Sequence, residues 1–585
     1  MLLAKPSCGE VILASTGILM SEALTVKQKM AALDEEQKRT IRAWCVYDWA
    51  NSAFSTSVTV AILPIYAMAL TNVYLDNNPE SFFANFSAAG MWAFVVGVST
   101  GIVALSSPVL GVLADRMEIK TTLLKIYTIG GAAATVLMFF SAFFGDYDWM
   151  FLLGCFFLAN LGFAGANVFY NALLPYLGEE ELMDEISSRG FAWGYIGGGL
   201  LLAIHFVMLM GSGNADWMIR LSLASVGIWW WGFSIYTFRN VPEPEIEDPL
   251  PKMSVGAATK LAFGELKKTF KELSKFKILV IYLIAYLMFN DGIQTVLSIA
   301  GAFGGDVLGV AILYNMLVIL IIQFVAAPSA MMFSKLAERT GTKNALIVTL
   351  IGWCLVIALA VGFVDLEPEK SSDADMSITK VDGGWEFNFI NDFELNEDLE
   401  SHMDLQKNWG LEEGAILANV DGLKEDIAGS ELSMGVVDGN SESVIIGSKH
   451  RSQIGEGTID WWPETLRENV WKPLGLGVNL QWLVLGLMAG MVMGGSQALA
   501  RSMFGMMVPE TRSTEFFGFF GFIGKAASVI GPMLYFVISS GMDDRLGVLS
   551  ILFIIVIGTI MMKWVDLEEG IKVAKEEDAS RRRDS

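Results

Sequence analysis

The chain has 585 residues, of which 53% are hydrophobic and 18% are charged. Soluble chains usually carry about 25% charged residues, so this composition excludes an ordinary soluble enzyme. The four cysteines and three histidines are scattered, and they form neither a disulfide framework nor the spacing of a metal site. We therefore expect no metal and no cofactor, and, because no basic patch is present, no nucleic-acid partner.

The net charge of −23 comes mainly from one segment of the chain. Residues 365–474 hold about 25 acidic and about 8 basic residues, so the rest of the chain carries only about −6. The acidity is therefore a property of that segment and not of the apolar body.

The apolar residues gather in runs of roughly 20, which is the length needed to cross a hydrocarbon core of about 30 Å. They predict about twelve membrane spans, and hence an all-α polytopic protein of the lipid bilayer. Six are expected in the first part of the chain, at 44–70, 83–113, 121–144, 149–172, 190–210 and 217–238. Six more are expected at 278–300, 308–333, 344–364, 476–505, 516–540 and 546–564.

The distribution of lysine and arginine predicts the orientation of these spans. About 29 basic residues fall on one side of the predicted topology, and about two, Arg220 and Arg545, fall in the short loops of the other side. Basic loops usually stay in the cytoplasm. We therefore expect the spans to cross a plasma (cytoplasmic) membrane and both termini to lie in the cytoplasm.

Two breaks divide the chain into parts. Residues 240–277 form a cytoplasmic linker between a bundle at 44–239 and the later spans, and residues 365–475 form an acidic insertion outside the cell. The aromatic and apolar content of the insertion is too high for a linker, so we expect a small folded domain there. The remaining parts are an N-terminal tail (1–43), the divided second bundle (278–364 and 476–565) and a C-terminal tail (566–585).

The two sets of six spans resemble each other. The loop after the second span holds Asp115, Arg116 and Lys120, and the loop after the eighth holds Glu338 and Arg339. The two acids are 223 positions apart, and so are the two arginines. A second pair of similar strings, starting at Phe191 and Gly518, is 327 residues apart. The second offset exceeds the first by about 104 residues, which is close to the length of the insertion. A duplicated unit with one later insert requires such a difference.

The acid in each of these loops predicts a latch between the halves. A carboxylate there can cap a helix N-terminus and pair with a basic group on a neighbouring helix, and such a contact can break when the halves rock. The simpler alternative is that these basic residues only follow the charge rule for cytoplasmic loops.

Several longer strings carry a resemblance to a known family. They are residues 47–54 (YDWANSAF), 171–175 (NALLP), 289–295 (FNDGIQT), 494–502 (GGSQALARS) and 515–518 (EFFG). Together with the paired loops they resemble the major facilitator superfamily and, more narrowly, its vacuole-effluxer branch related to autophagy-related protein 22. The resemblance implies two pseudo-symmetric six-helix halves, secondary transport and, for the eukaryotic member, export of neutral amino acids from a vacuole.

The chain departs from this pattern at two places. Glu118 and Ile119 stand where the superfamily usually has glycine and a basic residue, so we expect a weaker latch here than in the loop that contains Gly341 and Lys343. The acidic insertion is not part of the pattern.

Ionisable residues within the spans predict a binding site. Such a residue at mid-membrane costs about 2.5–3.5 kcal/mol on insertion scales, so it usually faces a cavity or a partner. Asp291 lies about 13 residues into its span beside Asn290 and Gln294, with Lys525 as the expected counter-charge. The alternatives are a structural carboxylate for Asp291 and a snorkelling side chain for Lys525.

Other polar residues are candidates for the site or for its gates. Asn51 and Gln497 can hydrogen-bond a zwitterion, although such amides more often join helices. Asp48 lies near the start of its span, where it is expected to act as a gate or to pair with Arg501 or Arg189. Glu515 belongs with the latch residues.

These observations predict a secondary transporter that exports a small polar solute, with amino acids as one candidate class. No phosphate-binding G-x-x-x-x-G-K-[ST] string is present, so we expect an ion gradient, of H⁺ or Na⁺, as the driving force. A membrane-anchored sensor that binds a ligand with its acidic outer domain is the alternative. An intramembrane enzyme is not expected, because His205 stands alone in the spans.

Overall fold

A computed structural model gives the arrangement of the chain. It describes residues 25–584 except 86–87, 214, 246–263, 265–274, 303–311, 365–373, 391–392, 394, 396–399, 429–431, 439–443, 448–457, 527–529 and 542–543. Most of the predicted N-terminal tail, most of the predicted 240–277 linker and the start of the predicted insertion therefore lie outside the described residues.

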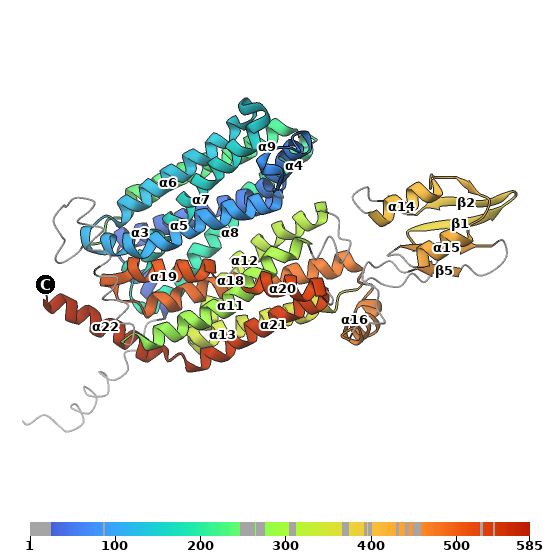
Figure 1. Cartoon of the computed structure of the whole chain (residues 1–585). Helices are drawn as coiled ribbons and strands as arrows, with labels where there is room; N and C mark the ends of the chain where they lie inside the picture. Colours follow the sequence, from blue (N-terminus) through green and yellow to red (C-terminus); the bar gives the residue numbers. More distant parts are fainter. Residues whose placement is uncertain are drawn as a thin grey trace, which may run out of the picture.

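The first half of the chain is helical (Figure 1). Asp34 begins α3: its carboxylate accepts a hydrogen bond from the backbone N–H of Gln37, and its own backbone N–H donates to the Gln37 side chain. The long helices of this half are α3 (Glu35–Ala53), η1 (Phe54–Ile62), α4 (Leu63–Asn77), α5 (Ala88–Met117), α6 (Lys120–Leu137), η3 (Met138–Tyr147), α7 (Asp148–Ala172), α8 (Met183–Gly211) and α9 (Asp216–Asn240). The short ones are α2 (Val26–Ala32), η2 (Phe82–Asn85), η4 (Leu174–Tyr176) and η5 (Glu180–Leu182).

The second half is built in the same way, with a sheet between its third and fourth long helices. The helices before the sheet are α11 (Lys277–Ala302), α12 (Ile312–Thr340) and α13 (Thr342–Val361). Those after it are α16 (Trp461–Leu466), η8 (Arg467–Trp471), α17 (Lys472–Leu474), α18 (Val478–Met506), η9 (Glu510–Arg512), α19 (Ser513–Ala526), α20 (Ile530–Gly541), α21 (Asp544–Met561), η10 (Met562–Trp564) and α22 (Leu567–Asp584).

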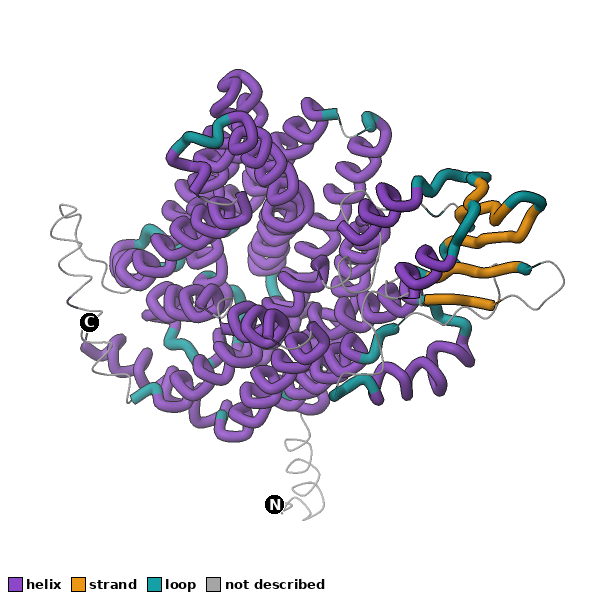
Figure 2. Tube along the Cα trace, turned by 45° about the vertical axis from the view of Figure 1, so that its right-hand side comes forward, coloured by secondary structure: helices purple, strands orange, loops and turns teal. Residues whose placement is uncertain are grey.

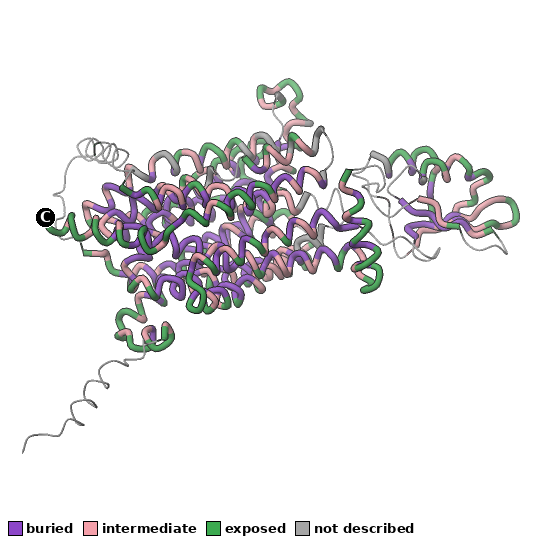
Figure 3. The backbone as a smooth tube through the Cα atoms, turned by 90° about the horizontal axis from the view of Figure 1, so that it is seen from below, coloured by how far each residue is buried: buried purple, intermediate pink, exposed green. Residues whose placement is uncertain are grey.

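Each half has its own hydrophobic core. One cluster of buried side chains runs from Met30 to Val241, and another runs from Phe276 to Val565 with Ala172 as its contribution from the first half. Large apolar residues such as Ile129, Leu355 and Phe553 are exposed on the outer faces of the helices (Figure 3). A surface of this kind suits lipid, because acyl chains replace water around it.

The helices coincide with the predicted spans. Eight helical segments of the described residues are long and apolar enough to cross a membrane. One of them, Lys120–Tyr176, covers two predicted spans that Gly145 separates with a φ of 55°. The other predicted spans fall on α5, α9 and the pair α19 and α20. The total of about twelve spans stays a prediction.

A five-stranded sheet lies beyond the helices in the order β3-β2-β1-β4-β5 (Figure 2). Its strands are β1 (Met376–Val381), β2 (Gly384–Phe389), β3 (Ile416–Leu417), β4 (Ser433–Val437) and β5 (Val444–Gly447), and α14 (Glu400–Trp409) and α15 (Asp421–Ala428) accompany it. The Asp382-Gly383 dipeptide turns β1 into the antiparallel β2, because Gly383 takes a φ of 106°. A separate core that includes Ile378, Phe387 and Met434 holds this unit together.

The sheet and the C-terminal helix lie at opposite ends of the helical body (Figure 1). The loops that contain Asp115 and Glu338 lie at the end where α22 lies, which we call the α22 end. Among the described residues, hydrogen bonds between the two halves gather at this end, as the bonds of Ser513, Asp184 and Arg501 illustrate. The halves are therefore tied together at the α22 end.

Candidate functional site

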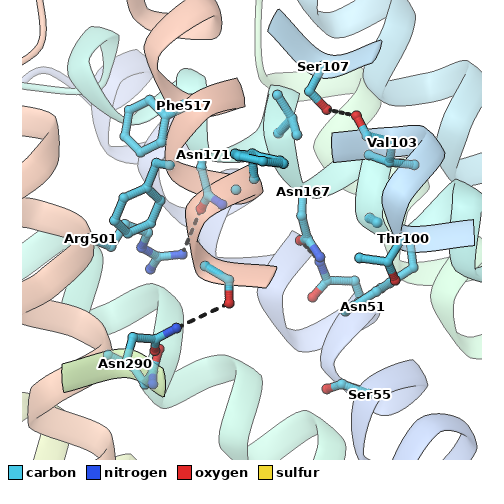
Figure 4. Close-up of a pocket in the computed structure, with 18 of the residues that line it drawn as sticks. Asn51, Ser55, Thr100, Val103, Ser107, Asn167, Asn171, Asn290, Arg501 and Phe517 are labelled. Carbon is cyan, nitrogen blue, oxygen red and sulfur yellow. Dashed lines mark hydrogen bonds between the residues drawn. The ribbon is translucent and has the colours of Figure 1, made fainter. Parts of the chain in front are cut away.

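A cavity of about 300 Å³ lies between the two halves (Figure 4). Helices α3, η1, α5, α7 and α8 form its wall on one side, and α11, α18 and α19 form the other. From the first half it is lined by Asp48, Asn51, Ser52, Ser55, Thr100, Val103, Ser107, Phe163, Ala164, Asn167, Val168, Asn171 and Phe191. From the second half it is lined by Tyr286, Asn290, Gln294, Gln497, Arg501, Phe517, Phe520, Gly521, Phe522 and Gly524.

Four of the predicted binding residues line this cavity: Asn51, Asn290, Gln294 and Gln497. The amide nitrogen of Asn51 donates to Asn167 at 2.8 Å, and that of Asn290 donates to the carbonyl of Gly524 at 3.2 Å. Sequence reasoning missed Asn167. It lies four residues before Asn171, on the same face of α7, and that spacing in an apolar span is the signal that could have identified it.

An ion pair joins the halves at the cavity wall. Nη1 of Arg501 lies 3.2 Å from Oδ2 of Asp48, and both side chains are buried. The hydroxyl of Tyr170 donates to the same carboxylate oxygen at 2.7 Å, and Arg501 also donates to Asn171 at 3.3 Å. Asp48, near the start of its predicted span, was expected to act as a gate or to pair with Arg501 or Arg189. The structure places it and its partner Arg501 in the wall of the cavity itself.

Aromatic rings cover the Arg501 guanidinium. Its central carbon lies 4.0 Å from the ring centre of Phe191 and 4.8 Å from that of Trp44. A guanidinium is weakly hydrated and stacks on aromatic faces, so these rings replace water around the charge. A Cβ at Gly190 would lie only 2.7 Å from the Asp48 carboxylate, so this close approach of α8 requires glycine.

Arg189 does not take part in this pair. Its side chain makes an ion pair of 2.8 Å with Glu185, four residues earlier on α8. Of the two arginines named as partners of Asp48, Arg501 is therefore the one that pairs with it.

Asp291 does not line the cavity either. It is fully buried, and a Cβ placed on Gly531 of α20 would lie 3.1 Å from its Oδ2. Asn290 and Gln294 face the cavity, whereas Asp291 lies one residue round the helix and faces α20. Lys525, its expected counter-charge, belongs to α19, but its side chain lies outside the described part of the structure.

The first predicted latch residue, Asp115, is buried at the α22 end between α5 and α19. Its carboxylate accepts hydrogen bonds from the backbone N–H groups of Thr514 at 3.1 Å and Glu515 at 2.9 Å. It also pairs with Lys120 at 2.9 Å. A carboxylate at this position is stabilised by the unsatisfied N–H groups and the dipole of the α19 N-terminus.

Two neighbours complete this contact. The Lys120 ammonium donates to the Ser513 hydroxyl across the halves at 3.1 Å and to the Tyr176 hydroxyl at 2.6 Å. The Glu515 carboxylate, predicted to belong to the latch, accepts from Arg512 of the second half at 2.9 Å. Arg116 is only partly buried at the end of α5.

The second predicted latch is built differently. Glu338 and Arg339 are exposed, so neither side chain is enclosed between the halves. The contact is made instead by Asp184 and Glu185 at the start of α8. Asp184 accepts from the Thr342 hydroxyl at 2.6 Å and from Ser502, and Glu185 accepts from Ser334 at 3.1 Å. Sequence reasoning missed both acids because they precede the span predicted at 190–210.

The fold resembles solved structures of membrane transporters. It matches the human organic anion transporter MFSD10 (TETRAN) with a TM-score of 0.52, at 10% identity and over 91% of this chain and 100% of that one. It matches the proton:xylose symporter XylE with a TM-score of 0.53, at 11% identity and over 91% of this chain and 95% of that one. The protein is therefore an integral membrane protein with the major facilitator fold.

The sequence comparisons identify the family. The family described as "Vacuole effluxer Atg22 like" matches residues 36–367 and 459–575, and the chain belongs to it. The matched ranges leave out 368–458, which contains the sheet.

Two relatives are similar over nearly the whole chain. An uncharacterized MFS-type transporter of Bacillus subtilis, YxiO, is 24% identical over 92% of this chain and 97% of its own length. Autophagy-related protein 22 of Kluyveromyces lactis is 19% identical over 95% of this chain and 99% of its own length. These relatives and the fold together assign the chain to MFS-type transporters.

Proposed function

We propose that this protein is a secondary active transporter that moves a small polar solute through the cavity between its halves, with zwitterionic amino acids as the candidate class and export as the direction. The observation that carries the proposal is the Asp48–Arg501 pair, which sits in a cavity wall rich in amides. A solute carboxylate can compete with Asp48 for the guanidinium, and a solute ammonium can compete with Arg501 for the carboxylate.

The cavity also suits alternating access. Its walls come from both halves, so a movement of one half against the other changes contacts with the solute on both sides. The ties at the α22 end correspond to a state closed at that end. With the orientation expected from the basic residues, the α22 end is cytoplasmic and the protein lies in a plasma membrane.

Binding can be tested before the solute is known. The purified protein would be screened against the natural amino acids, because a ligand that binds only the folded state raises its melting temperature. We expect Arg501→Lys to abolish the shift given by the best ligand, since lysine cannot reproduce the planar set of bonds. Arg239→Lys, at the exposed end of α9, is the matched control. An unchanged shift with Arg501→Lys would exclude this arginine from the site.

Transport and its coupling ion need a reconstituted system. Uptake of the labelled solute into proteoliposomes would be driven in turn by a pH step and by a Na⁺ step. We expect one of the two gradients to accelerate uptake and Asn290→Ala to raise the KM about tenfold, as the loss of one hydrogen bond to a bound solute implies. Absence of flux with intact ligand binding would contradict the transporter proposal.

The sensor alternative is separated from transport by deletion of the sheet. In a variant in which a short Gly/Ser linker replaces residues 368–458, we expect flux to continue, because the cavity residues and helix α16 lie outside this segment. Loss of ligand binding in the deletion variant, with no flux in the intact protein, would support the sensor.

A further inference from the structure

The C-terminal helix α22 lies at the end of the molecule where the halves are tied together (Figure 1). It is fixed firmly to the second half. The Asp578 carboxylate accepts from the backbone N–H groups of Glu510 at 2.8 Å and Thr511 at 3.0 Å, and from the Thr511 hydroxyl at 2.7 Å. It thus satisfies free N–H groups at the start of η9.

Further contacts strengthen this attachment. Arg512 of η9 lies 3.6 Å from Glu577, and Arg582 lies 3.1 Å from Glu510. Near the start of α22, a Cβ on Gly570 would lie only 2.8 Å from the sulfur of Met507, so the helix packs closely against the end of α18. Several independent bonds therefore hold α22 to the second half.

The same helix also reaches the first half, but with few contacts. Lys575 makes an ion pair of 2.7 Å with Glu180, and Ile571 is buried with Met183 of α8 and Met506 of α18. The lysine side chain is 70% exposed, so water screens this ion pair. A cavity of about 430 Å³ lies beside these contacts and is lined by Glu180, Met183 and Lys575 among others. The attachment to the first half is therefore incomplete.

The position of these weaker contacts is informative. Glu180 and Met183 lie directly before Asp184 and Glu185, which make the hydrogen bonds between α8 and the second half. If this end opens, α8 leaves the second half, and its contacts with Ile571 and Lys575 must break at the same step. The many bonds of Asp578 and Glu577 need not change.

We propose that α22 is a strap that favours the state closed at the α22 end: it remains on the second half throughout, and it holds the first half through Ile571 and Lys575. This inference rests on the alternating movement required by the proposed function. Shortening or loosening the strap increases the fraction of molecules open at this end and leaves the solute cavity unaltered.

Spin labels can measure that fraction directly. Labels would be attached to cysteines at Thr122 and Asn344, exposed positions at the α22 ends of the two halves, in a protein whose four native cysteines are replaced. We expect Ile571→Asp to raise the open-to-closed ratio about tenfold, because it places a charge in the apolar contact. Lys575→Glu is expected to raise the ratio about two- to threefold, as for an exposed ion pair.

Two controls keep the test specific. Lys572→Glu changes a lysine whose partner, Glu569, lies on α22 itself, so the ratio is expected to stay unchanged. Adding Glu180→Lys to Lys575→Glu restores the ion pair in reverse and is expected to return the ratio to its starting value. Equal ratios in the wild type, Ile571→Asp and Lys575→Glu, with normal melting temperatures, would overturn the strap. The distance between the labels is measured without solute. A failure of the transport assay can therefore be told apart from a failure of the strap proposal.

Discussion

Two of the contacts that tie the described parts of the halves together are counterparts in the predicted repeat. In the first, α5 meets α19; in the second, α12 meets α8. Positions 223 residues apart correspond, so Asp115 matches Glu338, Gly111 matches Ser334 and Glu118 matches Gly341.

The two contacts use opposite chemistry. The first buries a charge pair, Asp115 with Lys120, and Gly111 lets α19 approach so closely that a Cβ would lie 2.7 Å from the Thr514 carbonyl oxygen. In the second, the loop acid is exposed, and hydroxyls of Ser334 and Thr342 bind acids on α8. The two contacts therefore occupy matching positions in the predicted repeat, but in the second the charge lies on the opposite helix. The expectation of a weaker first latch stays a prediction, although the buried ion pair belongs to the first contact.

The largest expected effect follows from the buried pair. Asp115→Ala leaves the Lys120 ammonium buried without its carboxylate and removes the cap of α19. Removing one partner of a buried pair costs about 3–5 kcal/mol, so the closed state should lose more than 100-fold in population. The distance between labels at positions 122 and 344 measures this.

The matched variant at the second contact is Glu338→Ala. Because Glu338 is exposed, we expect a change within about 0.5 kcal/mol. Equal shifts for the two variants would show that the contacts do not differ as the structure indicates. The double change Asp115→Ala with Lys120→Met should recover part of the loss, since no charge then remains buried.

A smaller effect is expected when a hydroxyl of the second contact is removed. Thr342→Val takes one donor from Asp184, which keeps its bond from Ser502. The loss of one hydrogen bond to a buried charged group costs about 1–3 kcal/mol. The same label distance measures the change, and Thr340→Val, at an exposed position where the hydroxyl donates to the Leu336 carbonyl of its own helix, is the control. A ratio that does not move would remove Thr342 from the contact.

The comparison also shows what the sequence could predict. The apolar runs predicted the helices, because a segment that crosses lipid must satisfy its own backbone hydrogen bonds. The amides Asn51, Asn290, Gln294 and Gln497 were found because a polar side chain in an apolar run needs a cavity or a partner. The repeat gave the positions of both contacts.

Side-chain direction was harder to predict. Asp291 and Asn290 are neighbours in sequence, yet one residue turns the helix by about 100°, so only Asn290 reaches the cavity. The Asp48–Arg501 pair joins residues that are 453 positions apart. Sequence reasoning named the pair, but its place in the cavity wall depends on how α3 and α18 pack together, which no local pattern encodes.

A further prediction concerns the turn in each loop. Glu118 takes a φ of 51°, and its counterpart Gly341 takes a φ of 84°. A left-handed backbone costs an ordinary residue about 1 kcal/mol or more, and glycine does not bear this cost. We expect Glu118→Gly to stabilise the fold slightly and Gly341→Ala to destabilise it by about 1 kcal/mol, as measured by melting temperature. A lower melting temperature for Glu118→Gly would mean that the carboxylate contributes more than the turn costs.

The smallest expected effect is a pH dependence at the first contact, because η9, to which α22 is bound, leads directly into α19. Burial alone would raise the pKa of Glu577, but the hydrogen bond from Arg581 and the charges of Arg581 and Arg512 outweigh it, so this pKa lies below its ordinary value of 4.5. A carboxyl with a lowered pKa adds stability that is present above its unfolded pKa and is lost as the pH falls through the folded one. Glu510 has the opposite effect on the pH dependence of stability, because burial and the charge of Asp578 raise its pKa.

The difference between the wild type and Glu577→Gln isolates the first of these two groups. We expect the wild type to be the more stable protein above pH 4.5 and the two melting temperatures to converge as the pH falls below that value. A Glu577→Gln difference that persists undiminished at the lowest pH would mean that the amide alters packing, and that the charge of Glu577 does not support the α5–α19 contact.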